Sequence, residues 1–395
     1  MKVLAKGGLA VALSMLAVGA LGGGARADET IKLGLSVPLS GVGAIWGKGG
    51  DWMCKKATQE IREAGGVRVG GKVYNFECLA YDNKYNAADG TRVAQTLLNR
   101  DNVKFIGCAI GTVPIEALQS LSEREGVLVF NTSWGTNTKG PKHPLSFTIL
   151  NTPFEIMPAM VKYITGTYPQ AKTIVLLNAN DASGRENETI TRPMWEKAGI
   201  KILASDFYER GTTEFQPIAQ RLASFKPDII DLSSVPPADA GRLFKELDLL
   251  GFKGVKISDN GTGARDLVAT GGSAVDGVYM GAAMTFGGPD ITEHQRKLND
   301  EALASLGESL NTIDVGCYDA VYALKAAMEK TQSIVPTAVA AALPSVRFPT
   351  FYGGETGFGG KAFYGSDQQM ILPVFITQIE SGKLVEKARI DLQGN

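Results

Sequence analysis

The chain has 395 residues, with 40 basic and 41 acidic side chains and a formal net charge of −1. Hydrophobic residues make up 44% of it, which is typical of a globular protein with a buried core. A nearly neutral chain without clusters of Lys and Arg excludes nucleic acid and anionic membrane surfaces as expected partners.

The first 27 residues have the features of a secretory signal peptide. Lys2 and Lys6 give a positive start, residues 9–21 are apolar but too short to span a bilayer, and Ala-Arg-Ala at 25–27 supplies a cleavage site. A retained membrane anchor is the alternative, but the three glycines after the apolar run favour cleavage. We predict export to the periplasm and a mature chain of 368 residues, with 37 basic and 41 acidic side chains.

Strands and helices alternate along the first part of the mature chain. Strands are predicted at 31–37, 73–80, 105–110 and 127–130, and helices at 47–64, 87–100 and 114–124. This alternation is typical of a parallel sheet covered by helices on both faces.

The alternation restarts after residues 151–153. Helices are predicted at 154–167, 185–198, 215–225, 238–250, 292–306 and 314–330, and strands at 173–177, 200–207, 229–232, 255–257 and 278–280. A terminal hairpin is predicted from 372–379 and 384–390. The sequence therefore predicts an α/β fold of two Rossmann-like, doubly wound lobes.

The four cysteines of this exported chain raise the expectation of disulfide bonds. Cys54 lies in the first predicted helix and Cys78 in the strand after it, and consecutive elements of an α/β unit pack together, so this pair is the most favoured bridge. Cys108 with Cys317 is a second candidate pair, and two buried thiols are the alternative. No C-x-x-C is present, so no zinc site is predicted.

The sequence provides little for catalysis. His143 lies in a proline-rich loop and His294 on a polar helix face, and we interpret both as solvated side chains. Neither a G-x-S-x-G elbow nor an H-E-x-x-H motif is present. We therefore expect no catalytic residues, no metal and no enzyme activity.

A dinucleotide site is the sharpest enzyme hypothesis. Residues 41–46 read GVGAIW between a strand and a helix, which approximates G-x-G-x-x-G. The third glycine is replaced by Trp46, whose ring would block close helix–strand packing. The acid that binds the ribose in such sites would have to be Asp82, which lies beyond the expected position. We predict no cofactor, with an NAD-dependent oxidoreductase kept as an alternative.

Ligand capture is the other use of the loops that follow the strands. In open parallel sheets the crevice lies beyond the carboxyl ends of the strands. These loops are rich in Gly, Ser, Thr and Asn, carry Trp46 and Trp134, and span 40–46, 110–112, 131–135, 178–185, 233–237 and 258–263. Ordinary turn chemistry explains any one of them. Six together predict a polar, partly aromatic cleft whose helix N-termini can bind a carboxylate.

The chain resembles the type I periplasmic solute-binding proteins of ABC transporters, in particular the branched-chain amino-acid-type group. The segments that carry the resemblance are 31–41, 82–87, 127–133, 318–324 and 356–363. The resemblance implies two lobes joined by three hinge crossings, near Leu150, Met284 and Phe348. The N-terminal lobe is then 28–150 with 284–348, and the C-terminal lobe 151–283 with 349–395.

The resemblance also implies roles for individual positions. Trp46 matches the aromatic residue that covers the ligand, Gly111 and Thr112 match a carboxylate-binding loop, and Ser133 matches the next loop. Gly135 stands where a Thr is expected, Asn260 where amino-acid binders place an acid, and Pro236 near a Tyr position. The full predicted ligand set is Trp46, Ile110, Gly111, Thr112, Ser133, Trp134, Gly135, Ser183, Pro236 and Asn260.

These departures bear on the ligand. A buried ammonium group without a counter-charge costs several kcal/mol, of which a neutral amide such as Asn260 recovers only part. A small carboxylic acid, stacked on Trp46 or Trp134, is therefore favoured over an α-amino acid. The resemblance implies hinge closure, a membrane permease of an ABC transporter as partner and a monomeric chain; a ligand-sensing receptor module of the same fold stays as an alternative.

Overall fold

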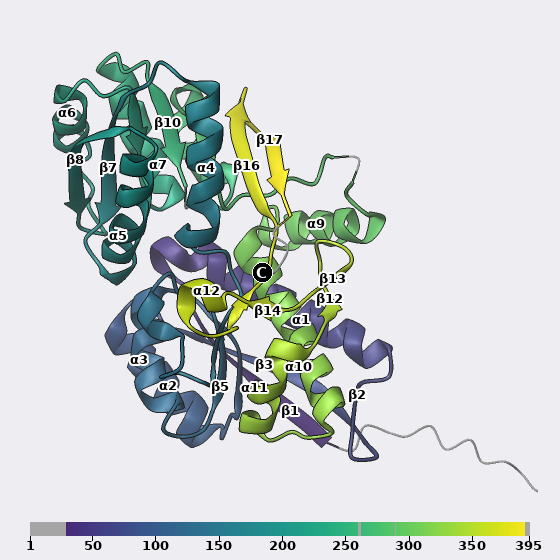
Figure 1. Ribbon diagram of the computed structural model, residues 1–395. Coiled ribbons are helices and arrows are strands. Elements are labelled where there is room, and N and C mark those ends of the chain that lie inside the picture. The colour runs from purple at the N-terminus through teal and green to yellow at the C-terminus, as the bar shows by residue number, and fades with distance from the viewer. Residues whose placement is uncertain (1–28, 260–261, 289, 392–395) are drawn as a thin grey trace, which may run out of the picture.

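The computed structural model describes residues 29–259, 262–288 and 290–391. Two sheets lie one above the other in the molecule, each covered by helices (Figure 1). We name the first sheet and its helices, residues 29–148 and 293–370, the N-lobe. The second sheet and its helices, within residues 153–280 and 374–391, form the C-lobe. The predicted signal peptide lies outside the described residues.

The N-lobe contains an eight-stranded sheet that is parallel except at its edges. Its strands, in spatial order, are β14 (Phe358–Gly359), β15 (Gln369–Met370), β6 (Ser146–Thr148), β5 (Leu128–Asn131), β4 (Phe105–Ala109), β1 (Glu29–Val37), β3 (Lys72–Asp82) and β2 (Val67–Val69). One face packs on α1 (Ala44–Glu63), α10 (Thr312–Thr331) and α11 (Pro336–Ala342), and the other on α2 (Ala87–Gln95) and α3 (Thr112–Ser122).

The C-lobe contains a seven-stranded sheet. Its strands, in spatial order, are β17 (Lys383–Ile390), β16 (Val374–Glu380), β11 (Tyr279–Met280), β10 (Val255–Ser258), β9 (Ile229–Asp231), β7 (Thr173–Ala179) and β8 (Lys201–Tyr208). One face packs on α4 (Pro153–Thr167) and α5 (Ala182–Lys197), and the other on α6 (Gln216–Ser224), α7 (Pro237–Leu249) and α8 (Ala264–Gly271). The predicted terminal hairpin is β16–β17, at one edge.

The chain passes between the lobes three times. The first crossing lies between β6 and α4, the second between β11 and α9 (Glu293–Leu306), and the third between β15 and β16. The first and third are joined, because the Asn151 side-chain amide donates to the carbonyl oxygen of Pro373 at 2.9 Å. The Thr312 hydroxyl donates to the carbonyl oxygen of Ala282 at 2.7 Å and so ties the second crossing to α10.

The third crossing lies after β15 and not near Phe348, where we expected it. Gln369 of β15 pairs in parallel with Thr148 of β6, which keeps this segment in the N-lobe. The reason is aromatic burial: Phe358 packs with ring centroids 5.1 Å from Phe147 and 6.2 Å from Phe130. Phe348 itself is fully buried in the same N-lobe core.

Both candidate cysteine pairs are at bonding distance. The Sγ atoms of Cys54 and Cys78 are 2.02 Å apart, and those of Cys108 and Cys317 are 1.97 Å apart. The first pair links α1 to β3 and the second links β4 to α10. Each therefore ties a helix to the N-lobe sheet.

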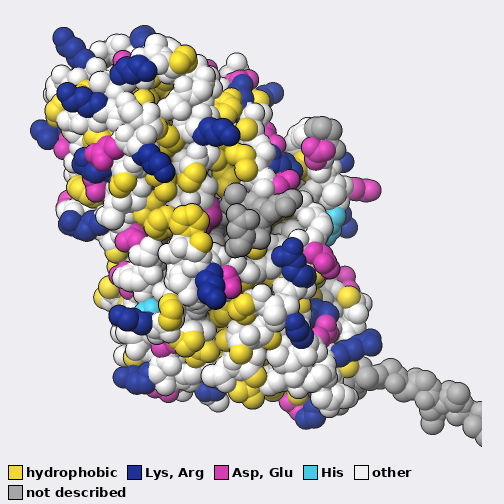
Figure 2. Space-filling model, viewed as in Figure 1, with side chains coloured by type: hydrophobic (Ala, Val, Ile, Leu, Met, Phe, Trp, Pro, Cys, Tyr) yellow, Lys and Arg dark blue, Asp and Glu magenta, His cyan; other side chains and the backbone are white. Residues whose placement is uncertain are grey.

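The visible surface carries mixed charges. Lys and Arg side chains alternate with Asp and Glu over the face shown in Figure 2. In the part of the chain that the structure describes, no helix combines the length and the apolarity needed to cross a membrane.

Candidate functional site

A small cavity lies between the two lobes, at the carboxyl ends of the N-lobe strands. It is lined by residues of both lobes and of the first crossing: Trp46, Tyr85, Ile110, Gly111, Thr112, Thr132, Trp134, Leu150, Ser183 and Ile313. Its volume is about 20 Å³, which is room for about one water molecule. A larger solute therefore requires a more open arrangement of the lobes.

Aromatic rings form much of the N-lobe wall. Trp46 and Trp134 are 3% and 4% exposed, and the Trp46 ring lies 5.7 Å from that of Tyr85. Trp46 is placed by the first turn of α1, which lies against the end of β1; a Cβ on Gly47 would come within 1.8 Å of the Pro38 carbonyl oxygen. These rings offer flat apolar surfaces for stacking.

The N-terminus of α3 supplies hydrogen-bond donors. Gly111 has a φ of 96°, and a Cβ there would meet the Tyr85 ring at 2.9 Å, so this position requires glycine. The Thr112 hydroxyl oxygen accepts from the Trp134 backbone N–H at 3.2 Å. The first N–H groups of α3 have no acceptor within the helix. This end of the cavity therefore suits a carboxylate.

The C-lobe wall is built on the N-terminus of α5. Asp181 caps this helix by accepting from the Gly184 N–H at 3.1 Å, and it also accepts from the Ser183 hydroxyl at 2.6 Å. Arg210 donates through Nε to Asp181 at 2.5 Å and lies 5.0 Å from the centroid of the Tyr85 ring. Burial raises the pKa of Asp181, but the Arg210 charge and these hydrogen bonds outweigh it and hold the pKa below its usual range.

Direct contacts join the lobes around the cavity. The Trp46 indole N–H donates to the Thr262 hydroxyl at 3.0 Å. Glu186 of α5 accepts from the Thr136 backbone N–H at 3.1 Å and from its hydroxyl at 2.6 Å. The structure is therefore a closed form of the molecule.

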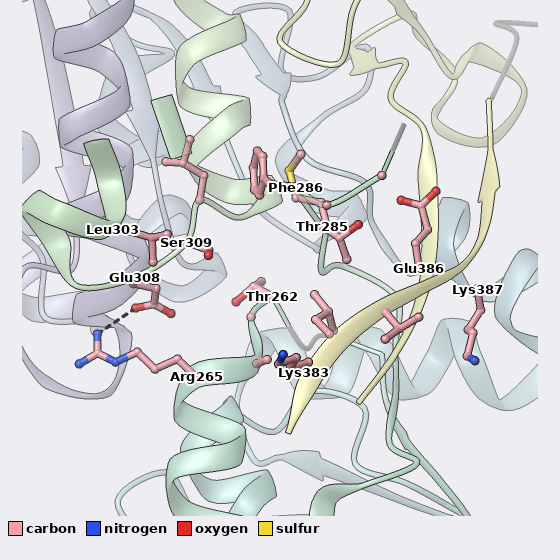
Figure 3. Close-up of a pocket in the computed structure, with 18 of the residues that line it drawn as sticks. Thr262, Arg265, Thr285, Phe286, Leu303, Glu308, Ser309, Lys383, Glu386 and Lys387 are labelled. Atoms are coloured by element: carbon pink, nitrogen blue, oxygen red, sulfur yellow. Dashed lines mark ion pairs between the residues drawn. The ribbon is translucent and has the colours of Figure 1, made fainter. Parts of the chain in front are cut away.

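Figure 3 shows a second, larger cavity of about 840 Å³. It is lined by α8, the second crossing, the α9–α10 connection and β17, with Phe286, Leu303 and Lys383 among its residues. Thr262 lines this cavity, whereas its partner Trp46 lines the smaller one. Arg265 and Glu308 form an ion pair at 3.6 Å across it, which is another contact between the lobes.

We expect Glu308 to make closure dependent on pH. Its side chain is 10% exposed, and burial together with the nearby Asp266 raises its pKa to about 7 against the opposing effect of Arg265. Asp314, on the first turn of α10, is the other carboxyl group that interacts with it. Separation of the lobes removes Asp266 and part of the burial, which raise the pKa, and also Arg265, which lowers it. Because the raising effects outweigh Arg265 in the closed form, we expect the pKa to fall on opening, so that closure takes up a proton.

We therefore expect lower pH to favour the closed form. Between pH 8 and pH 6, small-angle scattering of the ligand-free protein should show a decrease in the radius of gyration. The variant Glu308→Gln should show no such change. An equal response of the variant and the wild type would contradict this role of Glu308.

The structure brings six of the ten predicted ligand residues to the cavity wall: Trp46, Ile110, Gly111, Thr112, Trp134 and Ser183. Ser133 lies just behind the wall, where its hydroxyl accepts from the Gly135 N–H at 3.0 Å. Pro236 is buried at the start of α7 and is not part of this wall. Asn260 lies outside the described residues.

The predicted ligand set omits five contributors to the site, although Thr132 belongs to the predicted cleft loop 131–135. Tyr85, Thr132, Leu150 and Ile313 line the cavity, and Arg210 holds Ser183 and Asp181. Tyr85 has a φ of 58°, in a left-handed turn that follows β3. A count of the loop after every strand would have included both the Tyr85 and the Arg210 loops.

The residues considered for catalysis lie elsewhere. His143 lies 4.0 Å from Glu123, and His294 lies 3.6 Å from Glu60. Asp82 accepts from the backbone N–H groups of Leu39 and Lys84, at 2.8 and 2.9 Å, and so anchors a turn. Among residues 29–259, 262–288 and 290–391, no group of three or more His, Cys, Asp or Glu side chains is arranged to hold a metal.

Two lobes, three crossings and a cavity between them define a solute-binding protein of the hinge-closing class. The model of the periplasmic binding protein family matches residues 30–383, and the chain belongs to this family.

The chain is 25% identical to the leucine-, isoleucine-, valine-, threonine- and alanine-binding protein of Pseudomonas aeruginosa, over 85% of this chain and 87% of that protein. Among solved structures it is similar to the leucine-binding protein LivK of Thermotoga maritima, with a TM-score of 0.76, 18% identity and coverage of 91% and 99%. It is also similar to a solute-binding protein of an ABC transporter of Rhodopseudomonas palustris, solved with 3,4-dihydroxybenzoic acid. The TM-score is 0.74 and the identity 21%, and the alignment covers 92% of this chain and 97% of that chain. These comparisons confirm the predicted fold class.

Proposed function

We propose that this protein is the exported solute-binding component of an ABC importer and that it captures a small carboxylic acid with an aromatic or other apolar body. The observation that carries the proposal is the composition of the cavity wall. It combines the rings of Trp46, Tyr85 and Trp134 with the hydroxyl and N–H donors at the start of α3, and none of the described residues that line it is an Asp or a Glu.

The lack of an acid among the described residues of this wall disfavours an α-amino acid. Asp181, which accepts from the hydroxyl of the wall residue Ser183, is already paired with Arg210. An ammonium group in the cavity would lack a free counter-charge at a cost of several kcal/mol. A carboxylic acid without an amine avoids this cost. The ligand of the R. palustris protein belongs to this class, whereas the P. aeruginosa relative is named for amino acids.

Isothermal titration decides between the two ligand classes. We expect benzoate or a related aromatic acid to bind and leucine to bind at least 100-fold more weakly. Tight binding of leucine, with no binding of any aromatic acid, would overturn the proposed ligand class.

The proposed mechanism is capture without chemical change. The ligand contacts donors of the N-lobe and the wall of the C-lobe at once, so it gains both sets of contacts only when the lobes close. The closed form would then deliver the ligand to a membrane permease, with the chain acting as a monomer. Recovery of an altered compound from the cavity would contradict this mechanism.

Export to an oxidising compartment accompanies this role. The pairing of Cys54 with Cys78 and of Cys108 with Cys317 is consistent with such a compartment. We expect the purified mature protein, denatured without a reductant, to show no thiol that reacts with Ellman's reagent. After reduction it should show four. Detection of two or more free thiols before reduction would contradict the proposed pairing.

A further inference from the structure

The two walls of the small cavity offer a solute opposite hydrogen-bonding groups. On the N-lobe wall, the Thr112 oxygen accepts from Trp134, so the hydroxyl proton of Thr112 is available to donate. The first N–H groups of α3 lie beside it and also donate. The N-lobe wall is therefore a set of donors that matches a carboxylate.

The C-lobe wall presents an acceptor instead. Asp181 is held ionised, so it can only accept, and it takes the proton of Ser183 at 2.6 Å. Arg210 Nη2 donates to the same Ser183 oxygen at 3.0 Å. A hydroxyl oxygen has two acceptor positions, so Ser183 has no proton left to donate and one further acceptor position, beside the Tyr85 hydroxyl in the closed form. A solute group that meets Ser183 must therefore be a donor.

We propose, on the basis of the proposed function, that Ser183 accepts a hydrogen bond from a hydroxyl group at the end of the ligand remote from its carboxylate. The preferred ligands are then hydroxylated aromatic carboxylic acids. Arg210 and Asp181 are positioning residues, because they fix which way the Ser183 hydroxyl points.

The donors on the N-lobe wall and the acceptor on the C-lobe wall keep their hydrogen-bonding roles when the cleft opens. Asp181, Ser183 and Arg210 all belong to the C-lobe, and Thr112 and Trp134 both belong to the N-lobe. A rigid-body movement about the crossings leaves each set of bonds intact. The hydroxyl of Tyr85 interacts with Ser183 in the closed form, so a ligand hydroxyl that binds Ser183 takes the place of the Tyr85 hydroxyl.

Titration with matched pairs of ligands tests the proposal. The fluorobenzoates are close in size to the hydroxybenzoates but cannot donate, so benzoate and the 3- and 4-substituted hydroxy and fluoro acids are compared by calorimetry. We expect the better hydroxy acid to bind at least tenfold more tightly than its fluoro counterpart, because a site built around a hydrogen bond rejects a ligand that leaves it unmade. Ser183→Ala should reduce this ratio to about one, and Ser183→Thr should keep it.

The outcomes separate this proposal from the one on which it rests. If no aromatic acid binds, the proposed ligand class fails. If benzoate binds but the hydroxy and fluoro acids bind equally, or if Ser183→Ala keeps the preference, Ser183 is not the acceptor and the ligand class stands. The Asp181–Gly184 cap remains in Ser183→Ala, and the comparison on the wild-type protein decides the matter if that variant does not fold.

Discussion

Replacement of Trp46 by alanine is expected to weaken ligand binding by about 100-fold or more, which is about 2.7 kcal/mol. Trp46 is 3% exposed, lines the small cavity and donates to Thr262 across the lobes at 3.0 Å. The variant therefore loses a stacking surface and a contact that exists only in the closed form. Buried Trp side chains at binding sites often contribute this much.

Two measurements separate binding from folding in this variant. Truncation of a buried Trp also costs about 3–5 kcal/mol of stability, so thermal unfolding is followed together with calorimetric titration. The matched control is Trp46→Phe, which keeps a ring but removes the N–H that reaches Thr262. We expect it to lose affinity by about tenfold only. Wild-type affinity of a folded Trp46→Ala variant would remove this residue from the site.

The second large effect is expected from Gly184→Ala. A Cβ on Gly184 would lie 1.9 Å from the carbonyl oxygen of Ala179, so α5 cannot keep its place against the end of β7. The clash is with backbone, which cannot rotate away, and we expect a loss of more than about 3 kcal/mol of stability. Because the first turn of α5 carries Ser183, ligand binding should be lost as well.

Gly166 provides the matched control, because it is also a glycine within a helix. It is exposed on α4, and a Cβ there would meet no atom within 4 Å. Gly166→Ala should therefore stabilise the protein by roughly 0.5–1 kcal/mol through its higher helix propensity. Urea unfolding of both variants should show a lower free energy of unfolding for Gly184→Ala and a higher one for Gly166→Ala. Equal effects would show that the close approach of α5 to β7 does not matter.

The parts of this fold that could be predicted are those that depend on residues close together in the sequence. The alternation of strands and helices depends on the spacing of apolar residues within each segment, so the predicted β1, β7, α4 and α10 differ from the observed bounds by a few residues at most. Cys54 and Cys78 lie in consecutive elements, which made their proximity predictable. The glycine, hydroxyl and Trp residues that follow the strands identified most of the cavity wall for the same reason.

The positions that the sequence left open depend on distant partners. Gln369 joins the N-lobe sheet because β15 pairs with β6, more than 200 residues away, and a strand of two residues has no periodicity to reveal it. Arg210 reaches the site through Asp181 and the ring of Tyr85, which come from two other loops.

The sequence by itself thus determined an α/β chain with a leader-like start, a strand–helix pattern that restarts once and polar loops at the strand ends. The tertiary structure decided where the third crossing lies, which loops meet, and which way the Ser183 hydroxyl points. The physical reason is that periodicity and turn chemistry act between neighbours in the chain, whereas sheet order, ion pairs and the direction of a hydroxyl proton are set by groups brought together only by folding.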